Sequence, residues 1–125
     1  MERLEDLELT ISSFSNINQK SIQALLMSMQ KAVKLTKLKL NLSKYKFKWF
    51  FSLDLPEKTI TLLPFSPKLT EVVLDISCNR RVTDRDMLNL SSKLKSMSKI
   101  GLNLDFCSSI SEEAIEELVE MVSSQ

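Results

Sequence analysis

The third quarter of the chain recurs in the fourth, 28 residues later and without a gap. Seven apolar positions share this offset: Leu69, Val72, Leu74, Ile76, Val82, Met87 and Leu90 are followed by Met97, Ile100, Leu102, Leu104, Ile110, Ile115 and Leu118. A fixed period of this size is typical of repeat proteins, in which one unit cannot bury its apolar face alone and stacks against a neighbour. The period therefore predicts a stack of similar units.

Each unit combines two apolar spacings. Apolar residues at alternate positions come first and predict a strand with one buried face, and apolar residues three or four apart follow and predict an amphipathic helix. The same spacings occur twice in the first half of the chain, which gives four units: residues 4–34, 35–68, 69–96 and 97–125. We expect one domain, 1–125, of the α/β class, built from about four strand–helix repeats.

The second unit departs from the period. Its helical residues fit only if seven residues are inserted between Leu42 and Leu55, within the range 43–54. Pro56 is expected in the first turn of the second helix, where proline is tolerated, and Pro64 is expected to end that helix.

The third and fourth helices have clear start signals. Thr83 is expected to cap the third helix, with Asp86 completing a capping box, and Ser111 is expected to cap the fourth. Inward-facing positions of the last helix are predicted from the apolar spacing: Ala114, Ile115, Leu118, Val119 and Val122.

Composition argues against catalysis, metal binding and a bound cofactor. The chain has no histidine, the commonest general base and metal ligand, and a single glycine, too few for a phosphate-binding loop. The net charge of +1 disfavours nucleic acid, and no apolar run is long enough to span a membrane. The charged start and two cysteines predict a cytoplasmic protein without a disulfide.

The strands of the third and fourth units carry a recognisable pattern. It is Leu69-x-x-Val72-x-Leu74-x-Ile76 in one unit and Met97-x-x-Ile100-x-Leu102-x-Leu104 in the other. This pattern resembles the leucine-rich repeat, and the 28-residue period is similar to the ribonuclease-inhibitor-like subtype. The resemblance implies a curved solenoid with a concave parallel sheet and outer helices.

The residues after these strands resemble the cysteine-containing subtype found in many F-box substrate receptors. They are Ser77-Cys78 in the third unit and Cys107-Ser108 in the fourth. In that subtype the cysteine packs in the turn after the strand and helps to satisfy backbone groups. The resemblance covers essentially the whole chain, and a ubiquitin-ligase role would be expected to need an F-box elsewhere, since only three residues stand before Leu4.

Such arrays are general scaffolds, and the resemblance implies a non-enzymatic protein–protein interaction module. The concave face would present the strand residues that lie between the apolar ones. From this face we select Lys39, Asn41, Val73 and Asp75 as candidate partner-binding residues. The solenoid ends have no obvious separate cap, so self-association through them is a further expectation.

The insertion supplies the remaining candidates: Tyr45, Lys46, Phe47, Lys48, Trp49 and Phe50. One interpretation is an extended segment with its aromatic side chains packed down and its lysines in water. The other is a binding surface, because aromatic residues anchor protein partners and, together with lysines, also stack bases and hold phosphates. Two alternative functions therefore stay open: a substrate-recognition segment of a ubiquitin-ligase receptor, and nucleic-acid binding through residues 44–51.

Overall fold

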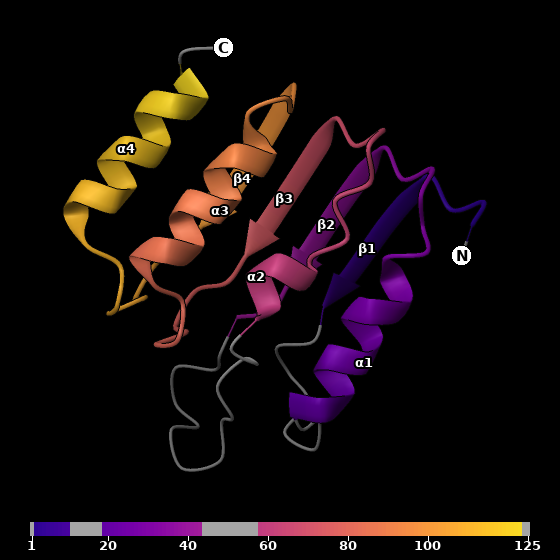
Figure 1. Cartoon of the computed structure of the whole chain (residues 1–125), viewed down its shortest axis with the longest axis horizontal. Helices are drawn as coiled ribbons and strands as arrows, with labels where there is room; N and C mark the ends of the chain where they lie inside the picture. Colours follow the sequence, from indigo (N-terminus) through magenta and orange to yellow (C-terminus); the bar gives the residue numbers. More distant parts are fainter. Residues whose placement is uncertain (1, 11–18, 44–57, 124–125) are drawn as a thin grey trace.

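The computed structural model describes residues 2–10, 19–43 and 58–123. In these ranges strands and helices alternate strictly along the chain (Figure 1). The elements are β1 (Asp6–Thr10), α1 (Gln19–Met29), β2 (Lys37–Asn41), α2 (Thr59–Leu62), β3 (Glu71–Asp75), α3 (Asp84–Leu94), β4 (Lys99–Asn103) and α4 (Glu112–Ser123). The chain is thus α/β, in agreement with the sequence analysis, and its architecture is compatible with a strand–helix repeat.

The four strands form one parallel sheet in the order β1-β2-β3-β4. Apolar residues of successive units face one another across it in two rows: Leu7, Leu38, Val72 and Ile100, then Leu9, Leu40, Leu74 and Leu102. The third and fourth strands pair at the 28-residue offset of the sequence repeat. The first and second strand pairs have larger offsets, as in Leu7–Leu38 and Leu38–Val72. These offsets match the longer first and second units.

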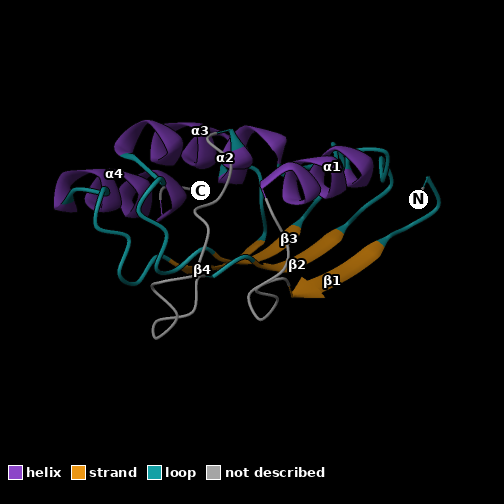
Figure 2. Ribbon diagram, turned by 90° about the horizontal axis from the view of Figure 1, so that it is seen from below, coloured by secondary structure: helices purple, strands orange, loops and turns teal. Residues whose placement is uncertain are grey.

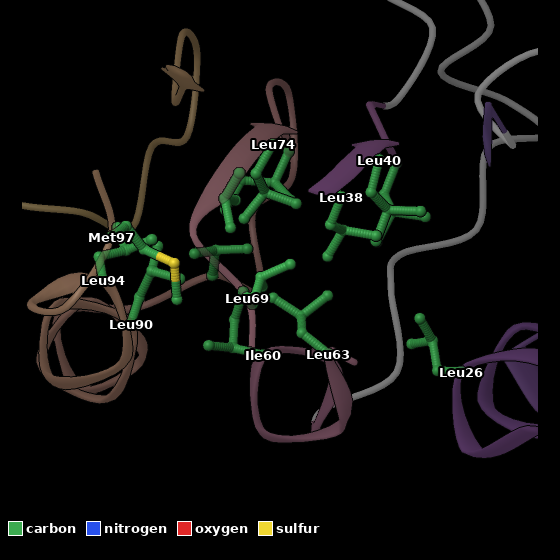
Figure 3. Packing of buried hydrophobic residues seen from close by; sticks show 14 of the residues in the cluster. Leu26, Leu38, Leu40, Ile60, Leu63, Leu69, Leu74, Leu90, Leu94 and Met97 are labelled. Carbon is green, nitrogen blue, oxygen red and sulfur yellow. The ribbon is translucent and has the colours of Figure 1, made fainter. Parts of the chain in front are cut away.

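The helices cover one side of this sheet as a single layer (Figure 2). The apolar strand side chains point toward them, and the two sets meet in the core shown in Figure 3, where Leu38 and Leu74 face residues such as Ile60 and Leu90. Burial is nearly complete in the middle strands, with Leu40 and Leu74 each 1% exposed. The equivalent apolar residues of β1 and β4 are only partly buried, because each of those strands has one neighbour.

The capping predictions for the third and fourth helices are confirmed. The Thr83 hydroxyl accepts a hydrogen bond from the Asp86 N–H (3.4 Å), and the Asp86 carboxylate accepts one from the Thr83 N–H (2.9 Å), which completes the capping box of α3. At α4 the Ser111 hydroxyl accepts a hydrogen bond from the Ala114 N–H at 3.1 Å. These bonds satisfy amide groups that a helix start leaves unpaired.

The second helix is short and ends before Pro64, as predicted. It begins at Thr59 and ends at Leu62, where Leu63 takes an extended conformation (φ −59°, ψ 140°) because it precedes Pro64. Pro56, expected in the first turn, lies outside the described residues. Lys93 of α3 supports the end of this helix by donating from its ammonium to the Ile60 and Thr61 carbonyls.

The orientation predicted for α4 is partly wrong. Ala114 and Leu118 are buried, but Ile115 is 38% exposed and Val119 is 57% exposed. Met87 holds the position of Ile115 one unit earlier and is 2% exposed, because α4 packs against α3. In the described part of the chain no further helix packs beyond α4, so its outer apolar side chains are left in solvent.

A carboxylate connects the starts of the last two helices. Ser111 donates to Asp84 twice, from its N–H to Oδ1 and from its hydroxyl to Oδ2, each at 2.7 Å. The backbone hydrogen bond and then the hydroxyl lower the pKa of Asp84, while burial acts in the opposite direction. The net shift is downward, so the ionised form is favoured in the folded state.

This bridge predicts a pH-dependent contribution to stability. Because the Asp84 pKa is lower in the folded state, the carboxylate stabilises the fold above its unfolded pKa, and this stabilisation is lost as pH falls through the folded pKa. Asp84→Asn should therefore lower the urea midpoint at neutral pH, and its difference from the wild type should shrink at about pH 3. Urea unfolding followed by circular dichroism at several pH values measures both.

Glu112→Gln is the matched control, since Glu112 begins α4 as Asp84 begins α3. Within the described residues its carboxylate takes part in no hydrogen bond or ion pair. The difference in urea midpoint between Glu112→Gln and the wild type should change less with pH than the difference between Asp84→Asn and the wild type. If both variants lose the same stability with the same pH dependence, the effect comes only from negative charge at a helix start. That result would contradict the bridge between Asp84 and Ser111.

Candidate binding face

The side of the sheet opposite the helices is uncovered in the described part of the chain (Figure 2). Each strand directs alternate side chains to this side, which we call the open face. It consists of three rows that run across the sheet from β1 to β4. The first row is Asp6, Lys37, Glu71 and Lys99, the second is Glu8, Lys39, Val73 and Gly101, and the third is Thr10, Asn41, Asp75 and Asn103. The predicted residues Lys39, Asn41, Val73 and Asp75 therefore share one surface.

Acidic and basic residues alternate across the open face. The first row runs Asp6, Lys37, Glu71, Lys99, so every charged side chain has an oppositely charged neighbour on the next strand. The Lys37 ammonium lies 4.0 Å from the Glu71 carboxylate. In the second row the Lys39 ammonium lies 3.5 Å from the Glu8 carboxylate. These exposed pairs contribute little stability, about 0–1 kcal/mol each, but they organise a surface of mixed sign.

Val73 is the apolar centre of the open face. It is 39% exposed and lies between Lys39 of β2 and Gly101 of β4. Because Gly101 has no side chain, one flank of Val73 stays uncovered. A Cβ added at Gly101 would lie 3.5 Å from both Val73 methyl groups, an ordinary contact, so no backbone constraint requires glycine there.

The third row shapes the chain where the strands end. Asn41 Oδ1 accepts from both the Ser43 N–H (3.0 Å) and the Ser43 hydroxyl (2.7 Å). Asp75 Oδ1 accepts the same pair of bonds from Ser77 at 3.0 and 2.7 Å. The remaining Asp75 oxygen accepts from the Asn103 amide at 3.3 Å. These side chains are thus Asx-type turn formers, and a ligand of the open face would meet them already oriented.

One buried asparagine below the turns was not predicted from the sequence. Asn79 is 1% exposed, and its amide nitrogen donates to the carbonyls of Leu42 (3.1 Å), Ile76 (2.9 Å) and Ser77 (3.1 Å). Cys107, 28 residues later, donates from its thiol to the Ile76 carbonyl at 3.2 Å. Each of the two side chains therefore bonds to the strand end of the preceding unit. Their shared place in the period was the signal that could have identified Asn79.

The prediction for the two cysteines holds for only one of them. Cys107 is buried and packs in the turn as expected, whereas Cys78 is half-buried and holds the position of Phe106. Cys78 (φ 64°) and Phe106 (φ 60°) both adopt the left-handed conformation that forms the turn. Burial raises the pKa of the Cys107 thiol, and both cysteines are free. Cys107 therefore has a structural explanation, since its buried thiol bonds to the Ile76 carbonyl.

Six predicted binding residues lie outside the described residues: Tyr45, Lys46, Phe47, Lys48, Trp49 and Phe50. The described chain stops at Ser43 and resumes at Lys58. Ser43 follows β2 next to the third row of the open face. The partner-binding role of residues 45–50 therefore stays a prediction.

A cleft of about 360 Å³ lies on the helix side, between the end of α1 and the turn before β3. Its charged side chain is Lys93, whose ammonium lies 5.3 Å from the centre of the Phe65 ring and donates to two carbonyls of α2. Burial lowers the pKa of Lys93. Because the Lys93 ammonium already bonds to the carbonyls at the end of α2, its contacts have a structural explanation.

No family model, curated protein or solved structure matches this chain. Within the described residues, no cluster of three or more potential metal-ligating side chains is present. The same part of the chain contains no helix of the length and apolar character needed to cross a membrane. The open face therefore carries the functional interpretation on its own geometry.

Proposed function

We propose that the chain is a non-enzymatic protein-binding module of the leucine-rich-repeat type, which binds its partner on the open face of the sheet. The observation that carries the proposal is the one-sided covering of the sheet: helices pack on one side, and twelve strand positions remain on the other. The regular pairing of the strands supports the solenoid interpretation, in which this face is concave.

The chemistry of the open face favours a protein partner over a nucleic acid. Lysine and acidic residues alternate, so a polyanion would meet Asp6, Glu8 and Glu71 as often as the lysines. A folded protein surface or an extended peptide with charges of both signs can match such a pattern. Val73, partly exposed beside Gly101, supplies an apolar contact at the centre, where interface energy is usually concentrated.

Residues 44–51 would extend this surface beyond the end of β2. Their aromatic side chains are of the kind that anchors protein interfaces, and Asn41 and Ser43 lie where the chain enters the segment. The ubiquitin-ligase alternative is a narrower form of the same proposal, since it requires a partner on this face and an F-box elsewhere.

A charge reversal on the open face tests the proposal. The double variant Lys39→Glu/Val73→Glu places two carboxylates at the centre of the face without touching the core. Affinity capture with quantitative mass spectrometry should recover at least one protein with the wild type that the double variant recovers at least about tenfold less, a loss of about 1.4 kcal/mol.

Leu88→Glu/Lys68→Glu is the matched control, because it makes the same kinds of change outside the open face. Leu88 is 57% exposed on α3, and Lys68 is exposed in the turn before β3. This variant should recover the same proteins as the wild type. If the open-face variant is folded and its recovered proteins match those of the control, the proposed binding face is wrong.

A further inference from the structure

The two ends of the stack leave apolar surface incompletely covered. Leu7 on β1 and Leu102 on β4 are only partly buried, although their counterparts in the middle strands are almost fully buried. Ile115 and Val119 of α4 add exposed apolar surface at the β4 end. β1 and β4 are also the edge strands of the sheet, and an edge strand is a template for pairing with another strand.

The charges of the open face are complementary between these two ends. The first row alternates from Asp6 at one edge to Lys99 at the other. Within the described residues, neither of these two terminal side chains forms an ion pair. A β1 strand placed beside β4 in the same parallel register would set Asp6 next to Lys99 and continue the alternation.

The helices at the two ends of the sheet also carry opposite charges. α4 carries Glu112, Glu113, Glu116, Glu117 and Glu120 and no lysine or arginine. The opposite end carries Lys20 on α1, followed by Lys31 and Lys34, and the range 19–34 contains no acidic residue. An α1 packed beside α4 would therefore bring basic residues to an acidic helix, just as the sheet rows bring Asp6 to Lys99.

We propose that the β4–α4 end binds the β1–α1 end of a second copy of this chain, head to tail. In this arrangement β4 pairs in parallel with the β1 of the next copy, and the two partly covered apolar ends bury each other. A two-fold dimer of β4–α4 ends is disfavoured, since it would place five glutamates against five. Head-to-tail contacts of this kind do not close on two copies, so the association continues beyond a dimer.

Sedimentation velocity over a range of protein concentrations tests the proposal on the full chain. The wild type should sediment faster as concentration rises, beyond the value for a dimer, and added salt should reverse the effect. Lys99→Glu and Asp6→Lys both change exposed side chains. Each variant alone brings like charges together at the contact and should weaken association at least about fivefold.

Mixing the two variants provides the decisive arm. The β4 end of K99E is complementary to the β1 end of D6K, and the remaining two ends keep the wild-type pair, so an equimolar mixture should associate like the wild type. A two-fold contact between like ends would respond to only one of the two single variants, because Asp6 and Lys99 lie at opposite edges of the sheet. A wild-type protein that stays monomeric at all concentrations, or a mixture that stays as dissociated as its components, would overturn the proposal.

Discussion

Leu74→Ala is expected to destabilise the protein by about 2–5 kcal/mol, the usual cost of truncating a fully buried leucine. Leu74 lies in β3 and is 1% exposed, with strands on both sides and helices above. The lost side chain leaves a cavity that neighbouring residues can fill only in part. The urea midpoint should therefore fall by about 1–3 M, which equilibrium unfolding monitored by circular dichroism measures directly.

Two variants sharpen this expectation. Leu102→Ala removes the same side chain at the equivalent position of β4, where it is only partly buried, so its cost should be clearly smaller at protein concentrations that keep the chain monomeric. Val73→Ala, on the open face next to Leu74, should change the free energy of unfolding by less than about 1 kcal/mol. Equal losses at Leu74 and Leu102 would contradict the difference in burial between the middle and the end of the sheet.

Asn79→Ala is expected to cost about 1–3 kcal/mol, although it removes a polar residue from an apolar environment. The amide nitrogen serves the carbonyls of Leu42, Ile76 and Ser77, and its loss leaves buried acceptors without a donor. Part of the cost is offset, because within the described residues the amide oxygen of Asn79 is itself buried without a partner. Urea unfolding measures the net effect.

Asn79→Cys tests whether a thiol donor can replace the amide donor at this position. Cys107 already holds the equivalent position of the fourth unit and donates from its thiol to the preceding strand end. A thiol at position 79 should therefore restore part of the stability that alanine loses. If Asn79→Cys proves no more stable than Asn79→Ala, the contacts of the Asn79 amide contribute less than the geometry indicates.

The repeat aligned the strand positions correctly. Leu38 and Leu40 hold the same repeat positions as Val72 and Leu74, and these positions are neighbours in the sheet. The parallel arrangement itself was implied by the resemblance to leucine-rich repeats. The alternation of apolar residues placed Lys39 on the open face, because successive strand residues point to opposite sides. Thr83 and Ser111 were equally predictable, since a helix start requires a local hydrogen-bond acceptor.

Other features depend on contacts that a periodic pattern does not encode. Ile115 repeats the position of Met87, but only Met87 has a following helix to cover it, so equal sequence positions differ in burial. Asn79 is polar within an apolar pattern, and its role depends on carbonyls that the fold brings within reach. Residues 43–54 break the period, and the period therefore says nothing about how the insertion contributes to binding.

Photo-crosslinking from the open face tests the proposed function most directly. A photoreactive phenylalanine analogue introduced in place of Val73 would sit at the centre of the open face, and the same analogue in place of Leu88 would sit on the helix side. We expect a partner protein to be crosslinked from position 73 and not from position 88. Crosslinking of the partner from position 88 alone would contradict it.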